Sequence, residues 1–250
     1  MFNKDKALLF LNFAETARLT KNELLQVYPT AVFIEDIKTD TQCYYLRFGD
    51  RNESVVIAFR DTEKKIKDWL TDLNSFHTVY PYGNNNSKIQ VHKGFIDAYK
   101  SVRYQLQTKL LNDIASIKKI YICGHSLGGA LATLCAVDVQ FNFPIHVECY
   151  QSGSPKVGNK EFAKSYDFRV PNTYRTFIKN DIVPTLPPSW IELISKGGYT
   201  HIGEKHPIGP FNPFIGLMML IKRKFKTEQI MDDLSNHSIS LYRKYILEAK

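Results

Sequence analysis

Residues 120–131 read Ile-Tyr-Ile-Cys-Gly-His-Ser-Leu-Gly-Gly-Ala-Leu. A short apolar run leads to Gly124, and small apolar residues continue to Ala136. A strand, a glycine-flanked serine and a helix in this order are typical of a nucleophile elbow, which presents the serine hydroxyl beside the first free amides of the helix. Because G-x-S-x-G alone occurs by chance in about one chain of this length in ten, the flanking strand and helix carry this prediction.

The chain around the elbow alternates strands with helices. Runs of apolar and β-branched residues predict strands at 31–35, 43–48, 54–59, 147–151 and 173–179. Apolar residues at helical spacing predict a long helix from Phe95 to Ile114 and one or two helices over 8–28. This alternation predicts one α/β domain over residues 1–250, with a mainly parallel central sheet and helices on both faces.

The charge balance favours anionic partners. The chain has 250 residues, a formal net charge of +8 and an isoelectric point of about 9.1. Nucleic acid and acidic lipid surfaces both suit this charge. Because the sequence holds no nucleic-acid motif, we expect a lipid surface and no nucleic-acid partner.

The cysteines and the first residues favour an intracellular compartment. The apolar run Ala7–Leu11 resembles a short signal-peptide core, but Asp5 and Asn12 flank it and we expect an amphipathic helix. The cysteines lack a metal-ligand spacing and three of them fall in segments expected to be buried, so we expect free thiols, with a Cys123–Cys149 bridge as the alternative.

A serine nucleophile needs a base and an acid that orients it. In hydrolases with an elbow, the acid and then the histidine follow the serine along the chain. We predict Asp181 as the acid because it follows the strand expected at 173–179, and reacting groups lie at the carboxyl ends of strands. Asp167 is the weaker alternative because no predicted strand leads to it.

We predict His237 as the base. It directly precedes the helical run 239–246, and a first helical turn can hold an imidazole rigidly. His201 and His206 are less favoured because both fall in a glycine-rich stretch that we expect to be a loop.

A tetrahedral oxyanion needs two amide donors. Leu127, the residue after the nucleophile, supplies one of them, and the loop after the strand at 54–59 supplies the other, at Thr62. Thr62 also suits the N-cap of a helix over 63–70, and the two roles are compatible.

These residues resemble the class 3 lipase family, which is typified by fungal triacylglycerol lipases. The resemblance runs in family order through 58–62, 68–73, 91–99, 124–131, 153–159 and 181–188. It implies an α/β-hydrolase fold with Ser126, Asp181 and His237 as a catalytic triad, and it places Thr62 and Leu127 at the oxyanion hole.

The resemblance also implies a lid at residues 63–70. Such a helix covers the site in water and opens at a lipid surface, so that its apolar edge of Ile66, Trp69 and Leu70 would meet acyl chains or membrane. The alternative is a fixed surface helix with Trp69 buried.

The chain departs from the family pattern in three ways. Asp61 stands where the family usually has glycine, and because aspartate tolerates unusual backbone angles we expect the oxyanion hole to persist. The signal peptide and disulfides of secreted relatives are not found. Residues 210–226 combine apolar side chains with the basic cluster Lys222-Arg223-Lys224. This segment suits an anchor at an anionic interface, or else it packs on the core or walls the acyl groove.

The sequence therefore predicts a serine hydrolase of lipid esters, acylglycerols or phospholipids, that works through an acyl-enzyme at a membrane or lipid-droplet surface. No metal or organic cofactor is expected. The alternatives are a catalytically silent lipase-like binding or signalling protein and an esterase for non-lipid esters.

Overall fold

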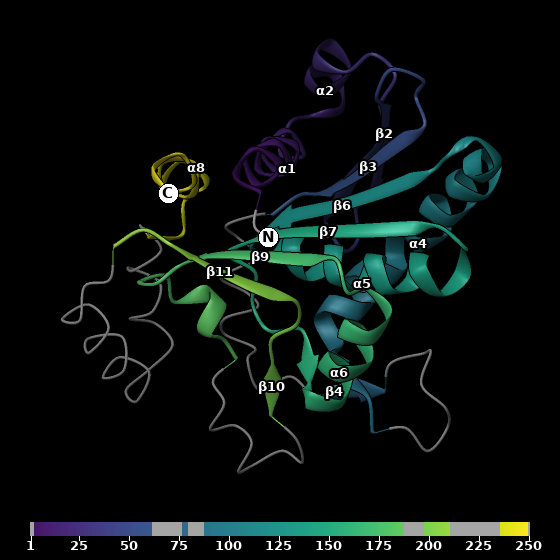
Figure 1. Cartoon of the computed structure of the whole chain (residues 1–250). Helices are drawn as coiled ribbons and strands as arrows, with labels where there is room; N and C mark the ends of the chain where they lie inside the picture. Colours follow the sequence, from purple (N-terminus) through teal and green to yellow (C-terminus); the bar gives the residue numbers. More distant parts are fainter. Residues whose placement is uncertain (1–2, 62–76, 80–87, 188–197, 211–235, 250) are drawn as a thin grey trace.

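The computed structural model describes residues 3–61, 77–79, 88–187, 198–210 and 236–249 (Figure 1). Several predictions from the sequence lie outside these residues. They concern Thr62, the lid at 63–70 with Ile66, Trp69 and Leu70, and the interfacial segment at 210–226, of which only Pro210 is described.

A seven-stranded sheet forms the centre of the fold, in the order β1-β2-β3-β6-β7-β9-β11. Its strands are β1 (Val32–Asp36), β2 (Thr41–Phe48), β3 (Ser54–Phe59), β6 (Lys119–His125), β7 (His146–Ser152), β9 (Thr173–Ile178) and β11 (Glu204–Ile208). The first three pair antiparallel, and β3 through β11 run parallel. This arrangement confirms the mainly parallel sheet of the prediction, and it brings the ends of β3, β6 and β9 to one edge.

The prediction of a loop around His206 is wrong, because this residue lies in β11. Strand β11 pairs with β9 alone, so it is an edge strand of this sheet. Pro207 lacks a backbone N–H and is tolerated at such an edge. The glycines and the proline therefore obscured a strand whose pairing partner lies about thirty residues earlier in the chain.

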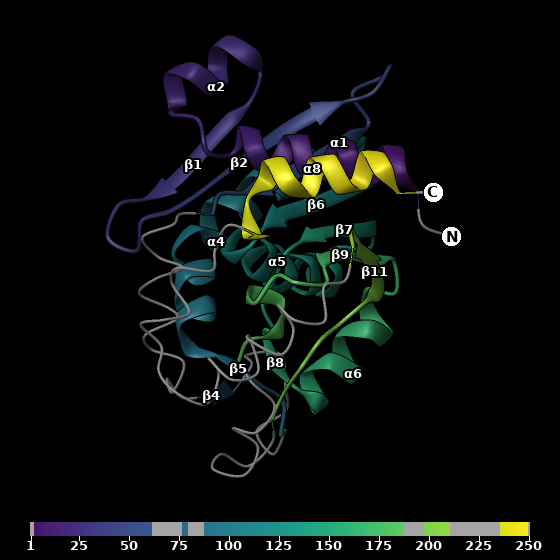
Figure 2. The same cartoon turned by 90° about the vertical axis from the view of Figure 1, so that its left-hand side faces the viewer.

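Helices cover both faces of the sheet (Figure 2). One face carries α1 (Lys4–Thr16) and α8 (Ile239–Glu248), and α2 (Lys21–Val27) follows α1. The other face carries α4 (Lys93–Asp113), α5 (Leu127–Asn142) and α6 (Lys160–Arg169). The helix expected from Phe95 to Ile114 is therefore confirmed as α4, and residues 8–28 form two helices.

Helices α1 and α2 begin at side chains that accept hydrogen bonds from free amides. Thr20 and Glu23 form a capping box at the start of α2, and the Asn3 side chain accepts from the amide of Lys6 at the start of α1. Such caps satisfy amide groups that have no partner within the helix. They explain why the 8–28 segment divides at Thr20 instead of forming one helix.

The main core lies between the sheet and the pair α4 and α5. It includes fully buried side chains from β3, β6 and both helices, among them Ile57, Ile122, Val102 and Leu134. Helix α5 is buried on all sides from Leu127 to Val139 because the sheet, α4 and α6 enclose it. The elbow at its first residue is consequently anchored in the most buried part of the molecule.

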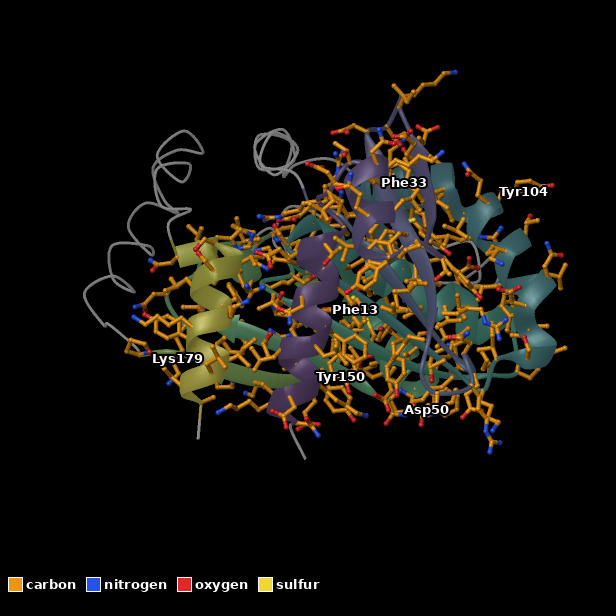
Figure 3. The ribbon with its side chains drawn as sticks, turned by 90° about the horizontal axis from the view of Figure 1, so that it is seen from above. Phe13, Phe33, Asp50, Tyr104, Tyr150 and Lys179 are labelled. Atoms are coloured by element: carbon orange, nitrogen blue, oxygen red, sulfur yellow. The ribbon has the colours of Figure 1, made fainter. Side chains whose placement is uncertain are left out.

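Helices α1 and α8 lie side by side on the opposite face (Figure 2, Figure 3). Leu11, Ile239 and Ile246 belong to the apolar cluster between them. The Lys4 ammonium donates to the carbonyl of Leu247 at 2.8 Å, and the Phe10 ring stacks on Tyr150 of the sheet at 4.2 Å between centroids. The first and last helices therefore hold each other in place.

A second sheet of four short strands lies beyond the main core, in the order β10-β8-β5-β4. These are β10 (Tyr199–Thr200), β8 (Gly158–Asn159), β5 (Gln90–His92) and β4 (His77–Val79). Two 3-10 turns, at Ile114–Ser116 and Val183–Thr185, complete the described elements. Among the residues that the structure describes, no helix has the length and hydrophobicity to cross a bilayer.

Candidate active site

Ser126 occupies a strained turn between β6 and α5. Its backbone lies at φ 54° and ψ −125°, a conformation that non-glycine residues seldom adopt. A Cβ added to Gly124 would lie 2.2 Å from the carbonyl atoms of Gly128, so only glycine permits this close approach. The structure therefore confirms the predicted strand, turn and helix.

The elbow leaves donors free beside the serine. The Ser126 amide donates to the Ser152 carbonyl at 2.9 Å, and the amides of Gly129 and Ala130 donate to the Ser126 carbonyl. No backbone acceptor in the described part of the chain takes the amide of Leu127. This amide is the first of α5, where the helix dipole is positive, so it can donate to a negative charge forming at the serine.

Asp181 and His237 meet although 56 residues separate them. Asp181 follows β9 and His237 precedes α8, and the distance from Nδ1 of the imidazole to Oδ2 of the carboxylate is 2.6 Å. Both side chains are buried, with 5% exposure for His237 and none for Asp181. A carboxylate oxygen can only accept, so Nδ1 carries the proton and Nε2 presents a lone pair.

Two further groups hold the Asp181 carboxylate. The Tyr242 hydroxyl donates to Oδ2 at 2.6 Å, and the Val183 amide donates to Oδ1 at 2.9 Å. Burial, reinforced by the negative charge of Asp181, raises the pKa of the Tyr242 hydroxyl, so it remains a neutral donor. The sequence predicted Tyr242 only as part of the helical run 239–246. The hydroxyl of Tyr242 is the one feature in the sequence that indicates a need for a buried hydrogen-bond partner.

His125, the residue before Ser126, links the elbow to His237. Its Nε2 lies 2.8 Å from the His237 carbonyl, and its ring stacks on the His237 ring at 4.7 Å between centroids. Burial, followed by the positive charge of His237, lowers the pKa of His125 to about 4, so the ring is neutral at pH 7. Because a carbonyl only accepts, the proton lies on Nε2, and Nδ1 accepts from the Ser152 hydroxyl 3.1 Å away.

Ser126 and His237 each keep one polar atom without a partner. Among the described residues, Oγ of Ser126 and Nε2 of His237 are both buried and neither makes a hydrogen bond. A Cβ built on Gly153 would lie 2.9 Å from Cε1 of His237, and Gly153 directly follows Ser152, which accepts the Ser126 amide. Ser126 and His237 therefore both adjoin the Ser152-Gly153 segment, without a hydrogen bond between the hydroxyl and the imidazole nitrogen.

The alternative acid and bases lie elsewhere. The Asp167 carboxylate is on α6 and accepts from the Gly203 amide at 2.7 Å. His201 contacts the Pro184 carbonyl through Nε2, and burial lowers its pKa to about 3. His206 lies 3.2 Å from Glu204 on the edge strand. These three side chains thus have partners of their own, whereas Asp181 and His237 pair with each other.

A cleft of about 300 Å³ opens beside Asp181. Lys156, Arg175 and His201 line it, and Arg175 is 6% exposed. Burial lowers the pKa of Arg175 to about 10, so its guanidinium still carries a charge at pH 7. Within the described ranges, no group of three histidine, cysteine or acidic side chains could hold a metal ion.

Asp61 does not adopt a positive φ, so the expectation that aspartate is tolerated here because it accepts unusual backbone angles is not supported. The non-glycine residues with positive φ in the described chain are Asp40, Asn52 and Ser126. Asp61 instead pairs with Arg18, whose Nε and Nη2 lie 2.7 and 2.6 Å from its two carboxylate oxygens. This partner lies 43 residues earlier and was missed, because nothing local in the sequence links the two.

Comparison with known proteins gives a consistent result. The model of a family described as Lipase (class 3) matches residues 56–190, more than half of the chain. A lipase from Rhizomucor miehei is 34% identical over 181 residues, which are 70% of this chain and 47% of that lipase. Phospholipase A1-IIgamma from Arabidopsis thaliana is 27% identical over 185 residues, 62% of this chain and 41% of that enzyme.

One solved structure in this group is described as a triacylglycerol lipase whose catalytic centre is formed by a serine protease triad. It superposes with a TM-score of 0.69 at 27% identity and covers 84% of this chain and 81% of its own. The chain spans less than half the length of the Rhizomucor and Arabidopsis relatives.

Proposed function

This chain belongs to the class 3 lipase family, and we propose that it is a serine hydrolase that cleaves carboxylic esters of lipids. The Asp181–His237 hydrogen bond of 2.6 Å beside the elbow of Ser126 carries this proposal. It joins an acid to a base with a free nitrogen, and the Ser126 hydroxyl is likewise buried without a partner among the described residues. The names of the relatives, a lipase and a phospholipase A1, support lipid esters as the substrate class.

In the proposed reaction, Nε2 of His237 takes the proton of Ser126 as Oγ attacks the ester carbonyl. The imidazolium that forms donates through Nδ1 to Asp181, which stabilises its charge. The proton on Nε2 then passes to the leaving alcohol, and an acyl-enzyme remains. Water, deprotonated by His237, releases the fatty acid and restores the serine.

The oxyanion of each tetrahedral intermediate needs preorganised donors. The free amide of Leu127 suits this role because it is the first of α5. We assign the second donor to Thr62, which follows the last described residue of the loop after β3. The Leu127 donor would be fixed before the reaction, because the elbow belongs to the buried core.

A fluorophosphonate probe tests this assignment. It phosphonylates an activated serine, so we expect one equivalent of label on the wild-type protein and none on Ser126→Ala. The matched control is Ser240→Ala, which removes an exposed hydroxyl and should label like the wild type. A folded wild-type protein that resists the probe would contradict the proposal and support the silent binding or signalling protein.

A panel of esters then separates the substrate classes. We expect turnover of long-chain acylglycerols or phospholipids, with faster turnover above the concentration at which the lipid forms an interface. Turnover confined to short soluble esters would instead identify an esterase for non-lipid substrates. Triacylglycerol, diacylglycerol and phospholipid presented in the same detergent would rank the lipid classes.

We also propose that the protein works as a peripheral protein at an anionic membrane or lipid-droplet surface. The net charge of +8 and the basic cluster Lys222-Arg223-Lys224 within 210–226 support this. Replacing these three residues by serine should weaken binding to vesicles that contain phosphatidylserine. The control replaces exposed Lys38, Lys100 and Lys164 by serine, which removes the same charge. Equal binding by both triple variants would exclude the anchor.

An intracellular location is the last part of the proposal. The four cysteines are free and buried, and burial raises the pKa of each thiol, so none is reactive. Free thiols are typical of proteins in a reducing compartment. Fractionation of cells that express the untagged chain tests this, and accumulation in the medium would contradict it.

A further inference from the structure

Asp61 is a second buried carboxylate at the active-site edge. It follows β3, is 4% exposed and receives two hydrogen bonds from one guanidinium, that of Arg18. Its location beside the elbow follows from the packing of β3 on α5. A Cβ on Gly128 would lie 2.4 Å from the carbonyl oxygen of Phe59, two residues before Asp61.

The Arg18 side chain is held in place by the turn that carries it. This turn joins α1 to α2, and the Gln42 side chain donates to the carbonyls of Ala17 and Leu19, on either side of Arg18, at 2.8 Å each. The Gln42 carbonyl accepts from the Arg60 amide at 3.0 Å. One hydrogen-bonded unit thus connects the turn, β2 and the end of β3.

The Asp61 carboxylate is within electrostatic reach of the candidate base. Burial alone would raise the pKa of Asp61, but the hydrogen bonds from Arg18 and the charges of His125, Arg18 and His237 together lower it. The titratable groups around His237 are Asp181 after β9, Tyr242 on α8, His125 on β6 and Asp61 after β3. Asp61 is the member of this group that pairs with an arginine.

An unpaired carboxylate at this position would oppose the proposed reaction in two ways. It would repel the oxyanion that forms beside the start of α5, and it would favour the protonated form of His237, which cannot act as a base. The guanidinium cancels most of this negative charge at short range. It also fixes Asp61 itself, two residues after the end of β3.

We propose that Arg18 is a positioning residue for the proposed reaction, which neutralises Asp61 and holds the end of β3 against the elbow. This inference rests on the proposed function. The pair acts through His237 and the oxyanion site without contacting substrate. Replacing Arg18 alone should therefore lower the rate of the reaction more than replacing both Arg18 and Asp61.

The test compares Arg18→Met, Asp61→Asn and the double variant. We expect Arg18→Met to lower kcat about tenfold or more with KM within about twofold, because the change acts on the transition state. The double variant should recover most of kcat. Losses in the single variants that simply add in the double variant would overturn the proposal.

The pH dependence separates this role from a merely structural one. Arg18→Met removes a positive charge near His237, so the acidic limb of the pH–rate profile should move up by on the order of half a pH unit. Asp61→Asn removes a negative charge, so this limb should move down. The double variant should return it toward the wild-type position. Limbs that do not move, or that move in the same direction in both single variants, contradict the inference.

The matched control is Arg103→Met. Arg103 pairs with the fully buried Asp138 at 2.8 Å, and its side chain is 32% exposed against 41% for Arg18. Asp138 lies about 18 Å along α5 from Ser126, at 1.5 Å per residue. This variant should lose stability and leave the pH–rate profile in place.

A readout without turnover keeps the inference separate from the proposed function. In the Ser126→Ala background, the ring-proton resonances of His237 should titrate at higher pH with Arg18→Met and at lower pH with Asp61→Asn. If the wild-type protein resists the fluorophosphonate probe, the proposed function fails, and this titration still decides whether the pair sets the charge of His237.

Discussion

Two buried carboxylates, Asp181 after β9 and Asp61 after β3, are satisfied in opposite ways. Asp181 accepts from the imidazole of His237, the hydroxyl of Tyr242 and the amide of Val183, all neutral donors. Asp61 accepts from the charged fork of Arg18. A carboxylate held by neutral donors retains its full charge for a developing imidazolium, whereas one paired with a guanidinium has its charge cancelled locally. The difference teaches that burial alone does not identify the acid of a triad.

The largest expected effect comes from removing the charge of Asp181. Asp181→Asn keeps the shape but no longer fixes the tautomer of His237, so kcat/KM should fall on the order of 10⁴-fold. Rates of ester hydrolysis and of fluorophosphonate labelling measure this. Asp167→Asn is the control, because Asp167 lies on α6 and contacts Gly203, and it should stay within about twofold of the wild type. Equal losses in both variants would remove the distinction between Asp181 and the alternative acid Asp167.

A smaller effect is expected when one neutral donor of Asp181 is removed. Tyr242→Phe deletes the hydroxyl that lies 2.6 Å from Oδ2, so kcat should fall about tenfold while the protein still labels. Tyr245→Phe, three residues later on the same helix, should change kcat less than twofold. If Tyr242→Phe is as active as the wild type, the hydroxyl does not position the acid.

The smallest effect concerns stability and belongs to Asp61. The folded-state pKa of this carboxyl lies below its unfolded value of about 3.9. Its contribution to stability is therefore present above that unfolded pKa and is lost as the pH falls through the folded pKa. Asp61→Asn should lower the free energy of unfolding by about 1–2 kcal/mol at pH 7. This is a small loss for a broken ion pair, because the Arg18 side chain is 41% exposed. This cost should shrink below about pH 4.

Urea denaturation of wild type and Asp61→Asn across this range measures the difference. A constant gap between the two proteins from pH 7 to pH 3 would mean that the aspartate contributes only by packing. The gap would then be unrelated to the charge that distinguishes Asp61 from Asp181.

The local parts of the fold were predictable because their causes are local. The elbow at Ser126 depends on glycines within two residues of it, so its strand, turn and helix could be predicted from one short stretch. Asp181 followed from the rule that reacting groups occupy strand ends, and His237 from its position before a helix. Each of these predictions needed only the neighbouring residues.

The remaining features depend on partners far away in the chain. Arg18 and Asp61 are 43 residues apart, and their pairing exists only because the turn after α1 reaches the end of β3. Strand β11 carries a proline and flanking glycines, so its pairing with β9 had no local signal. Tyr242 shares its spacing with the apolar face of α8, and only the folded structure distinguishes its hydroxyl.

The docking of α8 on α1 also affects when this protein can become active during its synthesis. A ribosome completes Ser126 and Asp181 well before His237, which comes 56 residues after the acid. The nascent chain therefore carries its nucleophile without a base until the last helix emerges and settles on the first. The proposed hydrolase would in this way stay inert during translation.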